Sequence, residues 1–195
     1  MSLQLSAKPY PEPLSLTETK LHLREDVTAQ DALIRAAIKA AREKVETDTH
    51  RALITQTWVE RLDAFPAEFK VHQPPLQSVT SITYTDTSGD TQTLSSSVYT
   101  VDIYSLPGRI VTAYGESWPS TRDVPNAVAM TFVAGYGDDR GDVPRPLRQA
   151  MLLLVGAWYE NREDVVSAPN YQVLTEMVGT ASYNNLIYPY KVPRF

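Results

Sequence analysis

Three glycines and three aspartates lie between an apolar, strand-like segment and an apolar, helix-like segment, where a nucleotide-binding loop would stand. They are Gly135, Gly137, Asp138, Asp139, Gly141 and Asp142. A dinucleotide-binding fingerprint has two residues between its second and third glycines, whereas three separate Gly137 from Gly141. A Walker loop would continue with Lys and then Ser or Thr, and this chain continues with Asp142 and Val143. The spacing therefore argues against phosphate binding.

The same aspartates could instead hold a hard cation, because carboxylate oxygens are the ligands that such cations prefer. Their spacing does not match a calcium-binding loop, and turns rich in Gly and Asp are a common way for a chain to leave a strand. We expect residues 138–142 to form a solvated turn. A small metal- or carboxylate-dependent hydrolase, with its site at Asp138, Asp139 and Asp142, is kept as an alternative.

Other residue types that carry chemistry are sparse. The chain has no cysteine, which excludes disulfides, thiol nucleophiles and thiolate metal sites. Its three histidines, His22, His50 and His72, do not form a pair at metal-ligand spacing, and no Gly-x-Ser-x-Gly nucleophile elbow occurs. We therefore expect no enzymatic activity, no cofactor and no metal site.

Composition limits the classes of partner. A formal charge of -5 and a pI near 5.2 argue against a protein that binds nucleic acid by neutralising phosphates. The longest apolar run, Ala150 to Tyr159, is far shorter than the roughly 20 residues of a membrane-spanning helix, and no signal peptide is recognisable. We expect one compact domain with an insertion, in a protein that contacts no membrane.

The first part of the chain reads as an extended arm followed by two helices. Residues 1–14 contain three prolines and no apolar periodicity, which predicts the arm. Ser15 and Glu18 have capping-box spacing ahead of a helix over residues 16–23. A second helix is expected over residues 28–49, with Thr28 as its cap and one buried face. That face is formed by Leu33, Ile34, Ala37, Ile38, Ala41 and Val45.

The opposite face of the second helix carries charges of both signs. It comprises Arg35, Lys39, Arg42, Glu43 and Glu46. Such a pattern is typical of a solvated helix face, and it also suits a contact with another subunit. We name Arg35, Lys39, Arg42 and Glu43 as candidate interface residues, with both interpretations open.

Residues 53–135 change to short segments rich in Thr, Val, Ile and Tyr, separated by turn residues, which predicts a mostly antiparallel sheet of about five strands. The strands are expected at residues 55–62, 79–85, 98–103, 109–113 and 127–134. Pro107 and Gly108 predict a type II turn, in which the glycine supplies a positive φ. A carbohydrate-binding β module is a further alternative, and it would need an exposed aromatic strip from Tyr84, Tyr99, Tyr104 or Trp118.

The last part of the chain predicts two more helices. One, over residues 144–162, is apolar nearly all round and carries Trp158, so we expect it in the core or at a subunit contact. A weaker helix follows over residues 170–187. Tyr188 is followed by a proline-rich end, residues 189–195, that carries Tyr190 and Phe195. This end suits either a partner-docking segment or a tail packed on its own domain, and Tyr188, Tyr190 and Phe195 are candidate interface residues. The predicted class is α+β: a helical body of about four helices with an inserted, mostly antiparallel β-sheet subdomain.

An ordered series of short motifs resembles the head-tail connector proteins of long-tailed bacteriophages, also called portal adaptors or head-completion proteins. The series consists of residues 21–24, 49–51, Thr57-Trp58, Pro74-Pro75-Leu76-Gln77-Ser78-Val79, 99–102, Pro107-Gly108-Arg109-Ile110, Phe132-Val133-Ala134-Gly135-Tyr136-Gly137 and Ala157-Trp158-Tyr159-Glu160-Asn161-Arg162-Glu163. The likeness extends from about Leu16 to Tyr190, and no single motif is diagnostic. Pro189-Tyr190-Lys191 comes later than a comparable terminus in the family.

The resemblance implies a structural virion protein, with residues 15–188 as a connector domain. It implies a homo-oligomeric ring of about twelve subunits that joins the phage portal to the tail-side neck, stopper or tail-completion protein and extends the DNA channel. The isolated chain could be monomeric, and DNA would pass through the channel without specific binding. The implied location is the neck of the virion, after assembly in the cytoplasm of the bacterial host.

Overall fold

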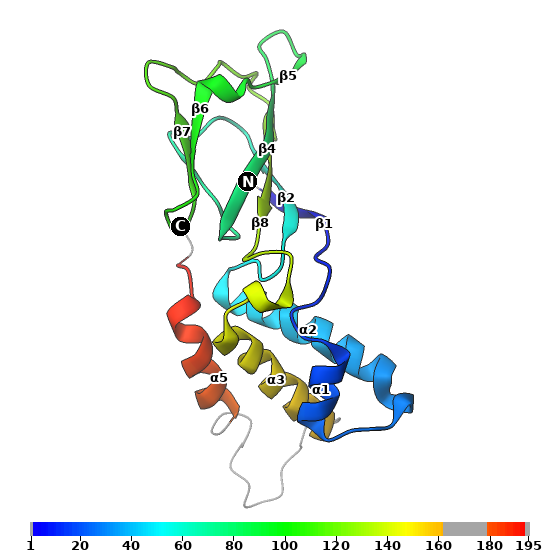
Figure 1. The fold of residues 1–195 in the computed structure, drawn as a ribbon. Coiled ribbons are helices and arrows are strands. Elements are labelled where there is room, and N and C mark those ends of the chain that lie inside the picture. The colour runs from blue at the N-terminus through cyan, green and yellow to red at the C-terminus, as the bar shows by residue number, and fades with distance from the viewer. Residues whose placement is uncertain (1, 162–178, 194–195) are drawn as a thin grey trace, which may run out of the picture. The chain divides into compact units, whose positions relative to one another are not determined.

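The computed structural model describes residues 2–161 and 179–193, which divide into two compact units (Figure 1). Residues 2–10 and 55–136 form a β unit, and residues 11–54, 137–161 and 179–193 form a helical unit. The α+β class predicted from the sequence is confirmed. Among the residues described, no helix is long and apolar enough to span a bilayer.

The helical unit is built around one central helix. Its helices are α1 (Leu16–Leu23), α2 (Asp31–Thr49), α3 (Arg145–Glu160) and α5 (Gly179–Ile187), with short 3-10 helices at Thr28–Gln30, Arg140–Asp142 and Tyr188–Tyr190. Figure 1 shows α3 between α1 and α5, and α3 contacts α1, α2 and α5. The part of the predicted fourth helix that covers residues 170–178 lies outside the described residues.

Helix α1 begins where its sequence predicts. The Ser15 hydroxyl oxygen accepts a hydrogen bond from the backbone N–H of Glu18 at 3.0 Å, which satisfies one of the free donors of the first turn. The Glu18 carboxylate does not complete the capping box but binds Arg148 of α3 at 2.6 Å. Arg24 ends the helix in the left-handed conformation, with φ 55°. Ser15 thus starts α1, and Glu18 fixes it to α3.

Helix α2 packs through a narrower stripe than the sequence predicts. Ile34, Ile38, Ala41 and Val45 are almost completely buried, whereas Leu33 is 46% exposed. At 100° per residue, Leu33 lies well outside the arc of the other four side chains, so its place in the core is wrong. The cap predicted at Thr28 is also wrong, because Thr28 begins a 3-10 turn and α2 follows from Asp31.

The β unit contains two sheets rather than the single sheet predicted. The larger has the order β1-β2-β8-β4-β5 and the smaller the order β3-β7-β6, with antiparallel pairing throughout. Figure 1 shows the smaller sheet facing the larger one. The strands are β1 (Ser2–Ala7), β2 (Gln56–Leu62), β3 (Phe69–Lys70), β4 (Leu76–Thr85), β5 (Thr91–Thr93), β6 (Tyr99–Asp102), β7 (Arg109–Thr112) and β8 (Val128–Ala134).

The core of the β unit lies between its sheets. Phe132 and Met130 of β8 and Ile82 of β4 are completely buried on the larger sheet, and Ile110 of β7 is completely buried on the smaller one. Alternate residues of β8 are buried, the pattern of a strand with one face in a core. The smaller sheet was not predicted because β3 has only two residues, too few for any alternation to be visible.

The N-terminal residues, predicted as an extended arm over residues 1–14, divide between a strand of the β unit and the helical unit. Strand β1 pairs with β2 in an antiparallel register, with Leu3 opposite Glu60 and Leu5 opposite Trp58. Residues 11–14 belong to the helical unit, where Leu14 is 1% exposed. The three prolines interrupt helix formation in this segment, but they leave its first residues free to join a sheet edge.

The turn before β7 also differs from its prediction. The Leu106–Pro107 bond is cis, and Gly108 does not have the positive φ of a type II turn. A Cβ at Gly108 would lie 2.6 Å from the Cβ of Leu76, which is closer than two carbons can approach. Close packing against Leu76, rather than backbone conformation, therefore explains the glycine.

Candidate interaction surfaces

The acidic segment that could have formed a hydrolase site is an exposed turn. Arg140–Asp142 form one turn of 3-10 helix, and the backbone N–H of Asp139 donates to the Asp142 carboxylate at 3.0 Å. Any Cβ at Gly137 would overlap that carboxylate, so the glycine leaves room for the turn to close. Within residues 2–161 and 179–193, no three His, Asp or Glu side chains gather as a metal site. The contacts of Asp142 are those of a structural turn.

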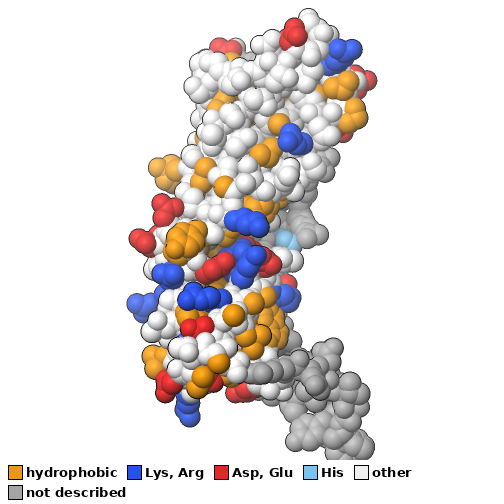
Figure 2. Space-filling view, turned by 90° about the vertical axis from the view of Figure 1, so that its right-hand side faces the viewer, with side chains coloured by type: hydrophobic (Ala, Val, Ile, Leu, Met, Phe, Trp, Pro, Cys, Tyr) orange, Lys and Arg blue, Asp and Glu red, His pale blue; other side chains and the backbone are white. Residues whose placement is uncertain are grey.

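The outer face of α2 is exposed at three of its four candidate residues. Arg35, Lys39 and Glu43 are exposed, whereas Arg42 is 4% exposed. On the face of the molecule shown in Figure 2, Lys and Arg side chains lie among those of Asp and Glu rather than in a separate patch. The structure therefore corrects the placement of Arg42, which belongs to the interior of the helical unit.

Arg42 is the centre of a buried ion-pair cluster. Its Nε donates to the Glu12 carboxylate at 2.8 Å, and its other nitrogens donate to Glu46 and, at 3.3 Å, to Glu43. Burial lowers the pKa of Arg42, but the charges of Glu46 and Glu12 outweigh that effect and the pKa is raised. Glu46 also accepts from the backbone N–H of Leu53 at 2.9 Å. The cluster thus fixes the segments before α1 and after α2 onto α2.

The C-terminal segment packs on its own helical unit. Arg51 donates from Nε to the backbone carbonyl of Tyr190 at 2.6 Å and lies 6.0 Å from the centre of the Tyr190 ring. The backbone N–H of Val192 donates to the carbonyl of Thr49 at 3.0 Å. These contacts favour the interpretation of a tail packed on its own domain over that of a free docking segment. Tyr188 is 76% exposed, and Phe195 lies outside the described residues.

Trp158 stands at the partly exposed end of α3, where its side chain is 38% exposed. The adjacent Tyr159 donates to the Glu25 carboxylate at 2.5 Å. That hydrogen bond is the main reason why the pKa of Glu25 is lowered, and it connects the end of α3 to the loop after α1. Trp158 is therefore carried on a fixed helix end, where an aromatic side chain can serve as an interface anchor.

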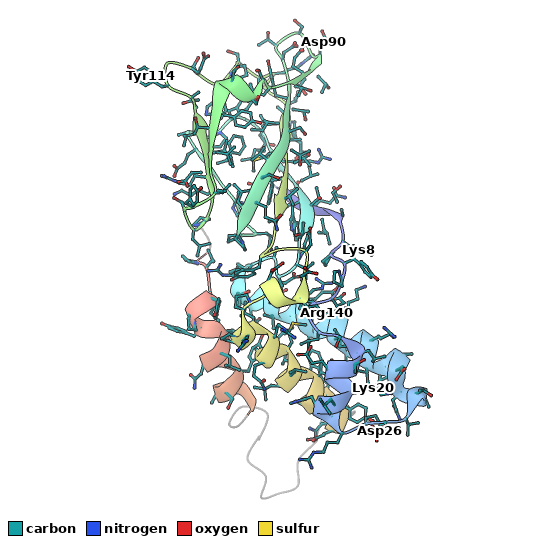
Figure 3. All side chains as sticks on the ribbon, viewed as in Figure 1. Lys8, Lys20, Asp26, Asp90, Tyr114 and Arg140 are labelled. Carbon is teal, nitrogen blue, oxygen red and sulfur yellow. The ribbon has the colours of Figure 1, made fainter. Side chains whose placement is uncertain are left out.

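A pocket of about 420 Å³ lies where α1 meets the start of α2. The lysine in its wall, Lys20, already has hydrogen-bond and ion-pair partners. The Lys20 ammonium lies 2.8 Å from the Asp31 carboxylate and 3.0 Å from the carbonyl oxygen of Val27. Figure 3 shows Lys20 on α1 and Asp26 in the loop that follows. Because the Lys20 ammonium has its partners within the same unit, we interpret the pocket as a feature of local packing.

The aromatic side chains that a carbohydrate module would need do not form one exposed strip. Trp118 stacks on Phe65 with ring centres 5.1 Å apart, and Tyr84 meets the same phenylalanine edge to face at 5.6 Å. Tyr104 is 95% exposed, and Tyr99 is partly buried. Tyr84 and Trp118 therefore support the interior of the β unit, while Tyr104 stands apart from them on a loop.

That loop is ordered and exposes apolar side chains, a feature that was not predicted from the sequence. Ile103, Tyr104 and Leu106 are exposed between β6 and β7. The Asp102 carboxylate accepts hydrogen bonds from the backbone N–H groups of Tyr104 and Ser105, the Ser105 hydroxyl and the Arg109 guanidinium. The Ser105 hydroxyl contributes most to lowering the pKa of Asp102, followed by Arg109. An Asp side chain commonly accepts a hydrogen bond from the backbone N–H two residues later and so forms a turn. Asp102 could therefore have identified this loop.

Tyr183 of α5 is expected to stay protonated at pH values at which exposed tyrosines ionise. Burial raises its pKa above the usual range, and its 2.8 Å hydrogen bond to Asp48 raises it further. The stabilisation from protonated Tyr183 is complete below the ordinary tyrosine pKa of about 10. It is lost as the pH rises further, because the unfolded chain releases this proton more readily than the folded one. Absorbance titration to about pH 11 should therefore give the same tyrosinate signal for the parent and Tyr183→Phe chains. A smaller signal in the variant would contradict the prediction.

Comparison with known proteins finds a family model that matches part of the chain and solved structures that match the fold of all of it. Residues 13–102 match the family of phage gp6-like head-tail connector proteins, which agrees with the resemblance seen in the sequence. No curated protein matches the chain.

Three solved structures share the fold of the whole chain, and in each case the match covers 100% of this chain and 97% of the other. The first, from the neck of an empty gene transfer agent (GTA) particle computed with C6 symmetry, has a TM-score of 0.78 and 24% identity. The second, from the virion of a native GTA particle, has a TM-score of 0.79 and 23% identity. The third, from the neck of a native GTA particle computed with C12 symmetry, has a TM-score of 0.72 and 25% identity.

Proposed function

Because residues 13–102 match the family of phage gp6-like head-tail connector proteins, we propose that this chain is a structural protein of a virion neck. The observation that carries the proposal is the agreement of two independent likenesses. The family match covers α1, α2 and strands β2 to β6, and the shared fold extends over the remaining helices and strands. Both point to a connector at the junction of head and tail.

The finer proposal is a ring-forming adaptor of about twelve copies. One of the neck structures that share this fold was computed with C12 symmetry, which supports that number. A closed ring requires a heterologous contact, in which one surface of each subunit binds a different surface of its neighbour. The exposed charges of Arg35, Lys39 and Glu43 on α2, together with Trp158 and Tyr188, are candidates for such contacts.

The ring would join the portal to the next neck, stopper or tail-completion protein and extend the DNA channel. A formal charge of -5 supports passage of DNA without binding, because few cations are available to replace the counterions of its phosphates. We propose assembly in the cytoplasm of the bacterial host and a final location in the neck. The proposed role requires no catalysis and no cofactor.

Removing the chain from cells that produce the particle tests this role. DNA-filled heads and free tails should accumulate, and complete particles should fall by at least about a hundredfold, because each head has one neck and no alternative connection. Negative-stain microscopy would count the three species, and the parent chain supplied in trans should restore complete particles. Normal numbers of complete particles without the chain would refute the role.

A further inference from the structure

Ring formation, on which this inference rests, leaves open which two surfaces of the helical unit meet. The outer face of α2 is the first candidate. Arg35 and Lys39 are exposed, and neither forms an ion pair within the part of the chain that the structure describes. Lys20 and Arg42 of the same unit, by contrast, are paired with carboxylates. Unpaired cations at this position are available to a second protein surface.

The same face of α2 has a low profile. Ala32 and Ala36 are exposed beside Arg35 and Lys39. Small side chains allow the backbone of a partner to approach a helix closely. This face is therefore shaped to receive a compact, negatively charged segment.

The acidic turn of residues 138–142 has the complementary properties. It carries three carboxylates and one guanidinium, all exposed, so its formal charge is -2. Its backbone is held by the 3.0 Å contact between Asp139 and Asp142, and Val143 anchors it with only 1% exposure. A preordered turn loses little conformational entropy on binding, which favours it as a docking element.

These two surfaces cannot meet within one copy. The buried stripe of α2 at Ile34, Ile38 and Val45 faces the helices of its own unit, and α3 is the helix that α2 contacts most extensively. The acidic turn leads directly into α3, and Figure 3 shows Arg140 at the N-terminal end of that helix. The turn thus lies on the side of α2 that α3 covers, whereas the exposed face points the other way. Only a second copy can bring them together.

We propose that the acidic turn of residues 138–142 in one copy docks on the outer face of α2 in the next copy around the ring. Asp138 and Asp139 lie against Arg35 and Lys39, and the turn covers Ala32 and Ala36 beside them. The contact is heterologous, as a closed ring requires.

Cysteine cross-linking tests the contact directly, because the parent chain has no cysteine. A chain with both Lys39→Cys and Asp138→Cys, treated with a short bismaleimide in purified form and in assembled particles, should give a ladder of dimers and higher multiples. Each single-cysteine chain should give no more than a dimer. A cross-link within one chain would overturn the proposal, because it would place the two surfaces on the same side.

An amine-reactive cross-linker applied to the parent chain separates the two possible failures. Multiples from this reagent without a ladder from the cysteine pair would overturn the assigned surfaces and leave the ring standing. No multiples from either reagent, in solution or in particles, would overturn the ring and the contact together.

Charge reversal provides a second test with an internal rescue. Lys39→Glu and Asp138→Lys should each weaken association between copies about tenfold, because each replaces an attractive contact with a repulsive one. The double variant should recover most of the loss, since it restores opposite charges. Lys191→Glu, which makes the same change at another exposed position, should have little effect. A loss in Lys191→Glu as large as that in Lys39→Glu, or no recovery in the double variant, which has the net charge of the parent chain, would contradict the proposal.

Discussion

Arg42→Ala is expected to lower the free energy of unfolding by about 3–5 kcal/mol, which is the typical cost of removing one partner of a buried ion pair. The variant would leave Glu46, whose side chain is 12% exposed, without its guanidinium and would release Glu12 from α2. Urea denaturation followed by circular dichroism would measure the change. A loss below about 1 kcal/mol would contradict the role given to this cluster.

Arg35→Ala is the matched control, because it removes the same side chain from an exposed position of the same helix. Surface substitutions of this kind usually change stability by less than about 0.5 kcal/mol. Hydrogen exchange would locate the effect: the Arg42 variant should exchange faster in α2 and in residues 11–15, and the Arg35 variant should match the parent chain. The comparison separates an internal structural role from an external interface role.

Phe132→Ala is expected to cost a similar amount, about 3–5 kcal/mol, because it removes a completely buried aromatic ring and leaves a cavity. Phe132 lies in β8, which pairs with β2 on one side and β4 on the other, directly opposite Trp58 and Val79. The sheet cannot collapse around the lost volume without disturbing both ladders. Unfolding in urea would give the magnitude, and faster exchange in β2, β4 and β8 would give the location.

Thr131→Ala supplies the control within the same strand. Its side chain is half-buried on the other face of β8, so the expected cost is no more than about 1 kcal/mol. Equal losses of unfolding free energy for the two variants would contradict the prediction, because they would mean that either face of β8 contributes equally to stability.

Much of the helical unit could be predicted because its signals are local. Ser15 identifies the start of α1 through a hydrogen bond that spans three residues. The stripe of α2 follows from helical periodicity, although Leu33 shows that an apolar side chain beside a stripe is not always part of it. Interactions within one or two turns of a helix are visible in a single sequence.

The β unit was less predictable because its organisation depends on distant pairings. Strand β8 was recognised from its alternating side chains, whereas β3 and β5 have only two and three residues. Strand β1 gains its structure from β2, more than fifty residues later in the chain. The second sheet and the place of the N-terminal residues therefore became visible only in three dimensions.

The features of the candidate surfaces likewise divide into those set by local sequence and those set by distant contacts. The exposure of Arg35 and Lys39 follows from the helical pattern of α2. The burial of Arg42 could not be predicted, because it depends on Glu12, thirty residues earlier, in a segment without regular structure. The ordered loop at Tyr104 was not predicted, because residues 98–103 have the composition of one strand, whereas Asp102 forms a turn with the backbone N–H groups of Tyr104 and Ser105.

Cryo-electron microscopy of intact particles, made with the parent chain carrying a small affinity tag, tests the central claim most directly. Antibody-labelled chains should form a closed ring of about twelve copies between head and tail, each copy showing both units of the structure. Particles that are complete but lack the chain, or that carry it away from the head-tail junction, would contradict it.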